Sequence, residues 1–268
     1  MSNPCLSLVI LTEDDGKDAR ATVEALVRKM LGLVVPGCRV HDRVAFLPRE
    51  PREEEAMRGN AWKTDGKNKN PVLHEQRVRL LRYIARRLCL PDTFVVFHID
   101  GDRPWADRRT SENVEKFDRL LVNALPQVVD RGRAVAGRAR KARGSPASAE
   151  GPQLRIENLL LLCPFRSIEA WVYQNLQRAV EICRRHHGAR HVAALTAWEE
   201  RRALLDELDH PEKELCLKKE HNLELASSGF PAELTRAIGK SFAESVGRME
   251  ACVDLRAALE RTLVTEHG

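Results

Sequence analysis

Several features that are common in other classes of protein are scarce or missing in this sequence of 268 residues. Aromatic residues make up only 5% of the chain, which argues against a broad stacking platform for single-stranded nucleic acid. No apolar run reaches about 18 residues, and the first residues lack the charged and then apolar layout of a signal peptide. We therefore expect a cytoplasmic protein that has no membrane partner.

Sequence signatures of a disulfide framework, a zinc site and a nucleotide-binding loop are also missing. The seven cysteines are scattered and odd in number, and no two of them form a CxxC pair. This pattern is typical of reduced core residues, not of a disulfide framework or a zinc site. Gly239-Lys240-Ser241 resembles the end of a P-loop, but position 234 is Leu where that motif requires glycine. Lys240 remains only as a candidate phosphate contact on a helical tail.

The chain does contain enough apolar sequence for a sizeable core. Hydrophobic residues make up 43% of it, and the formal net charge of +5 permits binding of a polyanion. The length suggests one large domain or two small ones. We expect an α/β domain over residues 1–187, followed by a helical C-terminal region over residues 188–268 in which no further strand is recognisable.

The first half of the chain alternates β-type runs with segments of helical periodicity. The runs at 6–11 and 94–99 are largely apolar and rich in β-branched or aromatic residues, as in strands that are buried on both faces. This alternation predicts a mostly parallel sheet flanked by helices. We expect strands at 6–11, 39–47, 94–99 and 156–162, and helices at 17–34, 74–88 and 111–129.

Two segments show no periodicity. Residues 49–71 are charged and punctuated by Gly and Pro, which predicts a long loop. Its Lys63, Lys67 and Lys69 either reach a phosphate or are simply solvated. Residues 131–151 are rich in Gly, Ala, Ser and Arg, and we expect a flexible insertion there. The six basic residues of this insertion either follow a phosphate backbone or are solvated.

Acidic residues follow the expected strands at their carboxyl ends, where open α/β sheets bind ligands. Asp100 and Asp102 come directly after the strand at 94–99, and an extended backbone would point them the same way. Two carboxylates this close repel each other unless a cation neutralises them, and Mg²⁺ or Mn²⁺ prefers such oxygen ligands. The alternative is that Asp100 only ends the strand and Asp102 caps the next element.

Two further acids occupy equivalent positions. Glu13 opens the run Glu13-Asp14-Asp15 after the first strand, and Glu169 lies in the first turn of a helix that follows the strand at 156–162. Asp14 and Asp15 compete with Glu13 for the same role. The candidate site is therefore Glu13, Asp100, Asp102 and Glu169, and the candidate substrate contacts are Lys17, Lys67, Arg103, Arg166 and Lys240.

Over residues 5–185 this arrangement resembles the Toprim family of topoisomerases, primases, overcoming-lysogenisation-defect nucleases and small RNA-maturation nucleases. In that family a glutamate follows the first strand and a D-x-D motif follows a later one, as Glu13 and Asp100-Gly101-Asp102 do here. The segment Ile168-Glu169-Ala170-Trp171 is similar to the I-E-x-W segment of Toprim-like proteins found among bacterial defence genes. Two features depart from the family: Asp14 follows the glutamate where Gly is usual, and the spacing between Glu13 and Asp100 is longer than in a minimal Toprim core.

The resemblance implies a Mg²⁺-dependent nuclease that cleaves DNA or RNA, with Asp100 and Asp102 holding the principal cation. It also implies that Glu13 acts as general base or acid or joins the ligands, and that Glu169 holds a second cation. A defence ATPase or a regulatory subunit is the protein partner that it suggests. Two alternatives remain open: a phosphatase of the haloacid dehalogenase type, whose D-x-D usually lies on the first strand, and a non-catalytic Toprim-like subunit that binds a partner or ligand.

Overall fold

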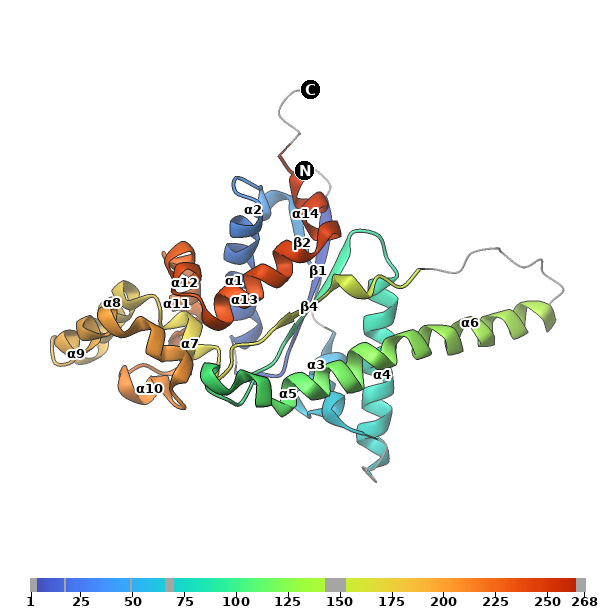
Figure 1. Ribbon diagram of the computed structural model, residues 1–268, viewed down its shortest axis with the longest axis horizontal. Helices are drawn as coiled ribbons and strands as arrows, with labels where there is room; N and C mark the ends of the chain where they lie inside the picture. Colours follow the sequence, from blue (N-terminus) through green and yellow to red (C-terminus); the bar gives the residue numbers. More distant parts are fainter. Residues whose placement is uncertain (1–3, 17, 49, 66–69, 143–152, 264–268) are drawn as a thin grey trace.

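The computed structural model describes residues 4–16, 18–48, 50–65, 70–142 and 153–263. At its centre is a sheet of four parallel strands in the order β2-β1-β3-β4 (Figure 1). The prediction of an α/β fold with a parallel sheet flanked by helices is therefore confirmed. The strands are β1 (Leu6–Thr12), β2 (Val44–Phe46), β3 (Thr93–His98) and β4 (Leu159–Leu162).

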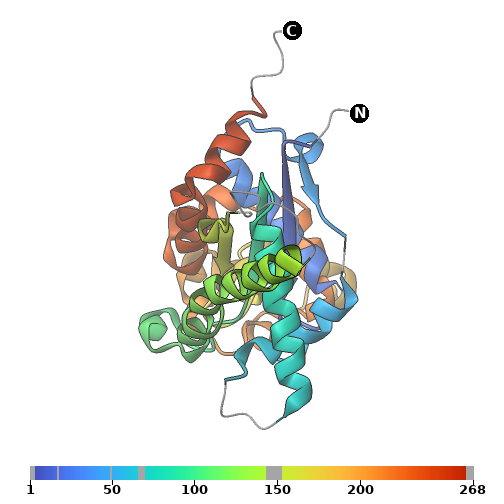
Figure 2. The ribbon, with the colours of Figure 1, turned by 90° about the vertical axis from the view of Figure 1, so that its right-hand side faces the viewer.

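Helices cover both faces of the sheet (Figures 1 and 2). Successive side chains of a strand point to opposite sides, so each strand contributes residues to a core on each face. Ile10 and Val96 face a core that they share with α1 (Ala19–Val34) and with the C-terminal helices. Val9, one residue before Ile10, faces a second core that includes α4 (Pro71–Leu88). Burial on both faces explains why β1 and β3 read as continuous apolar runs in the sequence.

Two segments contain helix where the sequence predicted strand or loop. Of the strand expected at 39–47 only β2 forms, because α2 (Val40–Arg43) occupies the preceding residues. The loop expected at 49–71 is also wrong, since most of its described part is α3 (Pro51–Arg58), the 3-10 turn η1 (Ala61–Lys63) and the start of α4. Pro51 at the first helical position and acids in the first turn favour this helix start, although α3 is too short to show a clear period.

The helix expected at 111–129 begins where the sequence predicted. The Oγ atom of Ser111 accepts the backbone N–H of Val114 at 3.3 Å, so Ser111 caps α5 (Glu112–Lys116). The helix then changes its winding before it continues. The next elements are the π-helical turn η3 (Phe117–Leu121), the 3-10 turn η4 (Val122–Ala124) and α6 (Leu125–Ala142).

The flexible insertion expected at 131–151 is wrong for residues 131–142, which belong to α6. The alanines and arginines that made this segment look unstructured are also strong helix formers. Residues 143–151 lie outside the described part of the chain. α6 extends away from the sheet to one side in Figure 1 and lies towards the viewer in Figure 2.

The region after residue 188 is helical, and its described residues contain no strand. It has no separate core: Leu205, Leu225 and Val246 belong to the same buried cluster as α1 and one face of the sheet. No helix in the described ranges has the length and apolar character that crossing a membrane requires. The remaining helical elements are α7 (Glu169–Val172), α8 (Leu176–His187), α9 (Val192–Thr196), η6 (Ala197–Glu207), α10 (Pro211–Glu214), η7 (Lys219–His221), α11 (Asn222–Ser227), α12 (Ala232–Ile238), α13 (Lys240–Ala251) and α14 (Val253–Glu260), together with the short turns η2 (Trp105–Thr110) and η5 (Ile156–Asn158).

Candidate functional site

Glu13 and Asp100 lie where the connections of the sheet change sides. β1 and β3 are neighbouring parallel strands, Glu13 follows the first, and Asp100 comes shortly after the second. The helix after β1 covers one face of the sheet, whereas α4, which leads into β3, covers the other. Such a reversal leaves a crevice at the carboxyl ends of the strands, which is where open α/β sheets bind their ligands.

The carboxylate of Glu13 is held between two parts of the chain. Its Oε1 accepts the backbone N–H of Asp100 at 2.7 Å, and its Oε2 lies 3.0 Å from Nζ of Lys63. The two acids that follow are placed differently. Asp14 accepts a backbone N–H from two residues further on at 3.1 Å, and Asp15 is exposed. Of these three acids, Glu13 is therefore the one held against Asp100.

The chain after β3 does not stay extended. The regular strand ends at His98, and Asp102 has a φ of 53°, in the left-handed region. The expectation that an extended backbone points Asp100 and Asp102 the same way is therefore wrong. Asn113 connects the two residues instead, because its Nδ2 donates to Oδ2 of Asp102 at 2.6 Å and to the carbonyl of Asp100 at 2.8 Å.

Gly101 allows this turn to lie directly against the chain that follows β4. A Cβ atom at this position would lie 2.8 Å from Cδ1 and 3.0 Å from Cα of Phe165. The N–H of Gly101 donates to the carbonyl of Pro164 at 2.9 Å, and its carbonyl accepts the hydroxyl of Ser111 at 2.7 Å. The glycine between the two acids is thus required by close approach of the backbone.

Glu169 and His98 are the buried members of this group. Glu169 begins α7, is 3% exposed, and accepts Nδ2 of Asn222 on its Oε1 at 2.9 Å. His98 is fully buried, with Nδ1 2.9 Å from Oγ1 of Thr12 and Nε2 4.0 Å from Oδ1 of Asp100. Burial lowers the pKa of His98 to about 4, so its imidazole is neutral near pH 7.

The pKa values of Asp100 and Glu13 are both raised. Burial raises the pKa of Asp100 well above its ordinary value, and neighbouring negative charges raise it further. Burial also raises the pKa of Glu13, although the ammonium of Lys63 opposes the shift. Within the described residues, the buried Oδ1 of Asp100 has no hydrogen-bond partner. The charges that act on Asp100 are those of Glu13, Glu169, Asp14 and Asp102.

Lys219 brings a positive charge to these acids from the C-terminal region. Burial alone would lower its pKa, but nearby carboxylates such as Asp14, Glu169 and Asp100 outweigh burial and raise it. Sequence reasoning missed Lys219, and it also missed Asn113 and Asn222, which hold Asp102 and Glu169. None of the three follows a strand, so no local signal in the sequence distinguishes them.

The candidate substrate contacts are less concentrated than the acids. Arg103 is exposed directly after Asp102. Arg166 forms an ion pair with Asp209, and Nζ of Lys240 lies 2.7 Å from Oε1 of Glu207, so both cations are engaged by other acids. Two further candidates, Lys17 and Lys67, lie outside the described residues.

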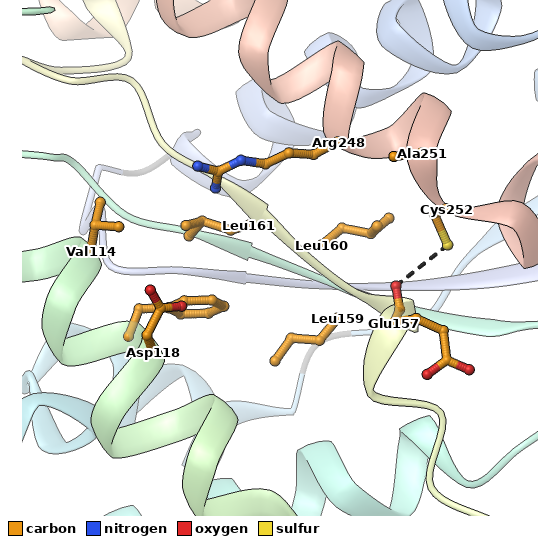
Figure 3. A pocket seen from close by; sticks show the side chains of 10 residues that line it. Val114, Asp118, Glu157, Leu159, Leu160, Leu161, Arg248, Ala251 and Cys252 are labelled. Atoms are coloured by element: carbon orange, nitrogen blue, oxygen red, sulfur yellow. Dashed lines mark hydrogen bonds between the residues drawn. The ribbon is translucent and has the colours of Figure 1, made fainter. Parts of the chain in front are cut away.

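One cavity adjoins the acids and another lies elsewhere along the sheet. The first, of about 270 Å³, is lined by Asp14 and Asp15 and by Arg20 and Arg58, both of which pair with Glu54. The second, of about 360 Å³, lies beside the edge strand β4 and is lined mainly by apolar side chains (Figure 3). None of the four candidate acids lines the second cavity. The four candidate acids do not line the first cavity either, but Thr12, Asp14 and Asp15, which flank Glu13 in the sequence, do.

The donor set has the right chemistry for a hard divalent cation. Carboxylate oxygens are the ligands that Mg²⁺ and Mn²⁺ prefer, and the unpartnered Oδ1 of Asp100 is available for one. Within the described residues, however, no three His, Cys, Asp or Glu side chains already stand in a metal-binding arrangement. Asp102 is turned towards Asn113 and Glu13 towards Lys63, so these side chains would have to rotate to share a cation.

Comparisons with known proteins do not assign the chain to a family. No protein-family model, no curated protein and no solved structure matches it. The functional argument therefore depends on the residues of this chain and on how the fold arranges them.

Proposed function

We propose that this protein is a Mg²⁺- or Mn²⁺-dependent nuclease that hydrolyses phosphodiester bonds in DNA or RNA. The observation that carries the proposal is the gathering of acids from three strand ends around Asp100, whose pKa is raised by burial and by their charges. Repelling carboxylates of this kind oppose folding unless a cation offsets them, which makes the group a candidate functional site. The Toprim resemblance supports the choice of nucleic acid as substrate and a role in bacterial defence.

In this proposal Asp100 and Asp102 hold the principal cation, and Glu169 contributes to a second position. A bound divalent cation supplies positive charge to the phosphoryl oxygens and lowers the pKa of an attacking water. Asn113 holds Asp102 and Asn222 holds Glu169 through the hydrogen bonds described above, and Asp102 would exchange its bond to Asn113 for the cation.

Glu13 is the residue that we assign to proton transfer. Its pKa is raised by burial, and a carboxyl with a raised pKa accepts and releases a proton more readily near pH 7. Lys63, 3.0 Å from Oε2, favours the ionised carboxylate and so limits this shift. The pair therefore leaves Glu13 able to take a proton from water and to return it to a leaving oxygen.

The proposal predicts cleavage that depends on a divalent cation. Labelled single- and double-stranded DNA and RNA are incubated with the protein in Mg²⁺, in Mn²⁺ or in EDTA, and the products are separated by size. We expect shortened products with either cation and none in EDTA. Binding without cleavage in every condition would favour the non-catalytic alternative, and hydrolysis of a phosphate monoester with intact nucleic acid would favour the phosphatase.

A second prediction concerns α6, which carries five basic residues at 131, 133, 138, 140 and 141. Replacing all five by Gln should weaken binding of nucleic acid and flatten its salt dependence, because each lost phosphate contact releases fewer counterions. On duplex DNA the log–log slope should fall by about 0.9 for each contact removed. Affinity is measured by fluorescence anisotropy over a range of salt concentrations.

The control for α6 removes the same number of charges from a different part of the surface. The five arginines at 184, 185, 190, 201 and 256 are exposed and belong to α8 and the helical region after it. Their replacement by Gln should leave the salt slope nearer to that of the wild type. An equal loss of affinity in both variants would show that α6 contributes only through net charge.

A further inference from the structure

Cys183 and Cys216 lie next to each other although they are far apart in the sequence. Cys183 is buried in α8, Cys216 is half-buried in the segment between α10 and η7, and their Sγ atoms are 3.2 Å apart. Other thiols of the chain point elsewhere: those of Cys38 and Cys252 lie against backbone carbonyls. Two thiols in contact across separate elements differ from the scattered reduced core cysteines that the sequence predicts.

We propose that Cys183 and Cys216 are an oxidation site, which a peroxide converts into an intramolecular disulfide. Sulfur atoms in a disulfide are about 2.05 Å apart, so closing the bond requires an approach of roughly 1 Å. Cys216 is the more accessible of the two and is the sulfur that meets the oxidant first. The proposal is independent of the nuclease activity.

The reaction balances with one peroxide as oxidant. The sulfur of Cys216 attacks one peroxide oxygen, the O–O bond breaks, and one water leaves with formation of a sulfenic acid. The sulfur of Cys183 then displaces the hydroxyl from Cys216, which forms the S–S bond and releases a second water. The two thiols lose two protons and two electrons in total. Burial and the neighbouring thiol raise the pKa of Cys216 to about 12, so its thiol is protonated at neutral pH and the first step is slow.

The position of the pair gives the bond a consequence for the acidic site. Lys219 follows Cys216 by three residues and faces Asp14, Glu169 and Asp100. Asn222, at the start of the next helix, holds Glu169 at 2.9 Å. A disulfide would therefore tie the segment that delivers both side chains to α8, and would restrict its opening.

Peptide mapping of the full-length protein tests the proposal directly. The protein is treated with hydrogen peroxide, unreacted thiols are blocked, and the digest is analysed by mass spectrometry without reduction. We expect two of the seven thiols to be lost, together with a cross-linked peptide that joins Cys183 to Cys216 and separates on reduction. Amide hydrogen exchange over residues 216–222 should slow, and Tm should rise by several degrees.

Three variants make the result specific. Cys216→Ser and Cys183→Ser should each abolish the cross-linked peptide and the slower exchange. If Cys183→Ser fails to fold, Cys216→Ser still tests the proposal, because Cys216 is the less buried of the two. Cys5→Ser, which removes a half-buried cysteine directly before β1, should leave both effects intact. Loss of thiols without a 183–216 peptide, a different pairing, or no reaction at millimolar peroxide would each overturn the proposal.

Discussion

Replacing Asp100 by Asn is expected to remove cation-dependent cleavage and most of the stabilisation that the cation provides. The substitution preserves shape but takes the charge from the residue on which the other acids converge. A loss of about 100- to 1000-fold in cleavage rate is the scale expected when one group that stabilises transition-state charge is removed. In the wild type, a cation at about 100 times its Kd should add about 2.7 kcal/mol to the free energy of unfolding.

The metal-free variant should be as stable as the wild type or more stable. Because the pKa of Asp100 is raised in the folded state, the native protein binds more protons than the unfolded chain above the ordinary pKa of 3.8. Ionising Asp100 therefore opposes folding, and the wild type loses stability as pH rises from that value through the raised pKa. The amide that replaces the carboxyl in Asp100→Asn does not titrate, so in EDTA this part of the pH dependence should disappear.

Thermal melts in EDTA, Mg²⁺ and Mn²⁺ between pH 4 and pH 8 measure both effects. Asp107→Asn is the matched control, because Asp107 is exposed in η2, close in sequence but outside the group of acids. It should behave as the wild type does. Full cation-dependent stabilisation and cleavage in Asp100→Asn would place the site elsewhere, and an unfolded variant would mean that Asp100 serves the fold.

Gly101→Ala is expected to lower both stability and activity. The new methyl group would overlap Phe165 at 2.8 Å from Cδ1 and 3.0 Å from Cα, and the backbone atom of that pair has little room to move. Overpacking of this kind costs about 1–3 kcal/mol. The least costly relief is to move the turn away from Phe165, which would also displace Asp100 and Asp102. Cleavage should therefore fall even at temperatures where the variant remains folded.

The stability of Gly101→Ala is measured by urea denaturation, with Gly32→Ala as the control variant. Gly32 lies within α1, and a Cβ added there meets no atom within 4 Å. Because Ala is favoured over Gly inside a helix by about 0.5–1 kcal/mol, this control should be slightly stabilised and fully active. If Gly101→Ala matched the wild type in denaturation midpoint and cleavage, the close approach to Phe165 would matter neither for stability nor for activity.

The sheet was readable from the sequence because its strands are buried on both faces. β1 and β3 appear as long apolar runs, and such runs in a chain that also shows helical periods indicate a parallel sheet. The short helix α3 and the bounds of the short strand β2 could not be predicted from the sequence. β2 spans only Val44–Phe46, and α3 covers about two turns, which is too little sequence for either period to stand out. In α6, the composition concealed a helix whose residues have good intrinsic propensity.

The meeting of Glu13 and Asp100 could be predicted from the sequence for the same reason. Acids that follow buried strands are visible in sequence order, and a parallel sheet brings their strand ends to one edge, as for Glu13 and Asp100. The residues that hold those acids come from other places. Asn113 lies in a helix start and Lys219 in a short turn of the C-terminal region, so only the packing of distant elements reveals their role.

The shared core of the sheet and the C-terminal helices has a consequence for biosynthesis. All four strands and the acids at 13, 100, 102 and 169 leave the ribosome before the helices that cover one face of the sheet. At about 5–20 residues per second, that face has α1 but lacks its C-terminal cover for several seconds. Lys219 also arrives only then, whereas Lys63, the positive neighbour of Glu13, is made early. The nascent chain therefore exposes apolar surface of the sheet until the helices after residue 188 have been made, which is the interval in which chaperones would bind it.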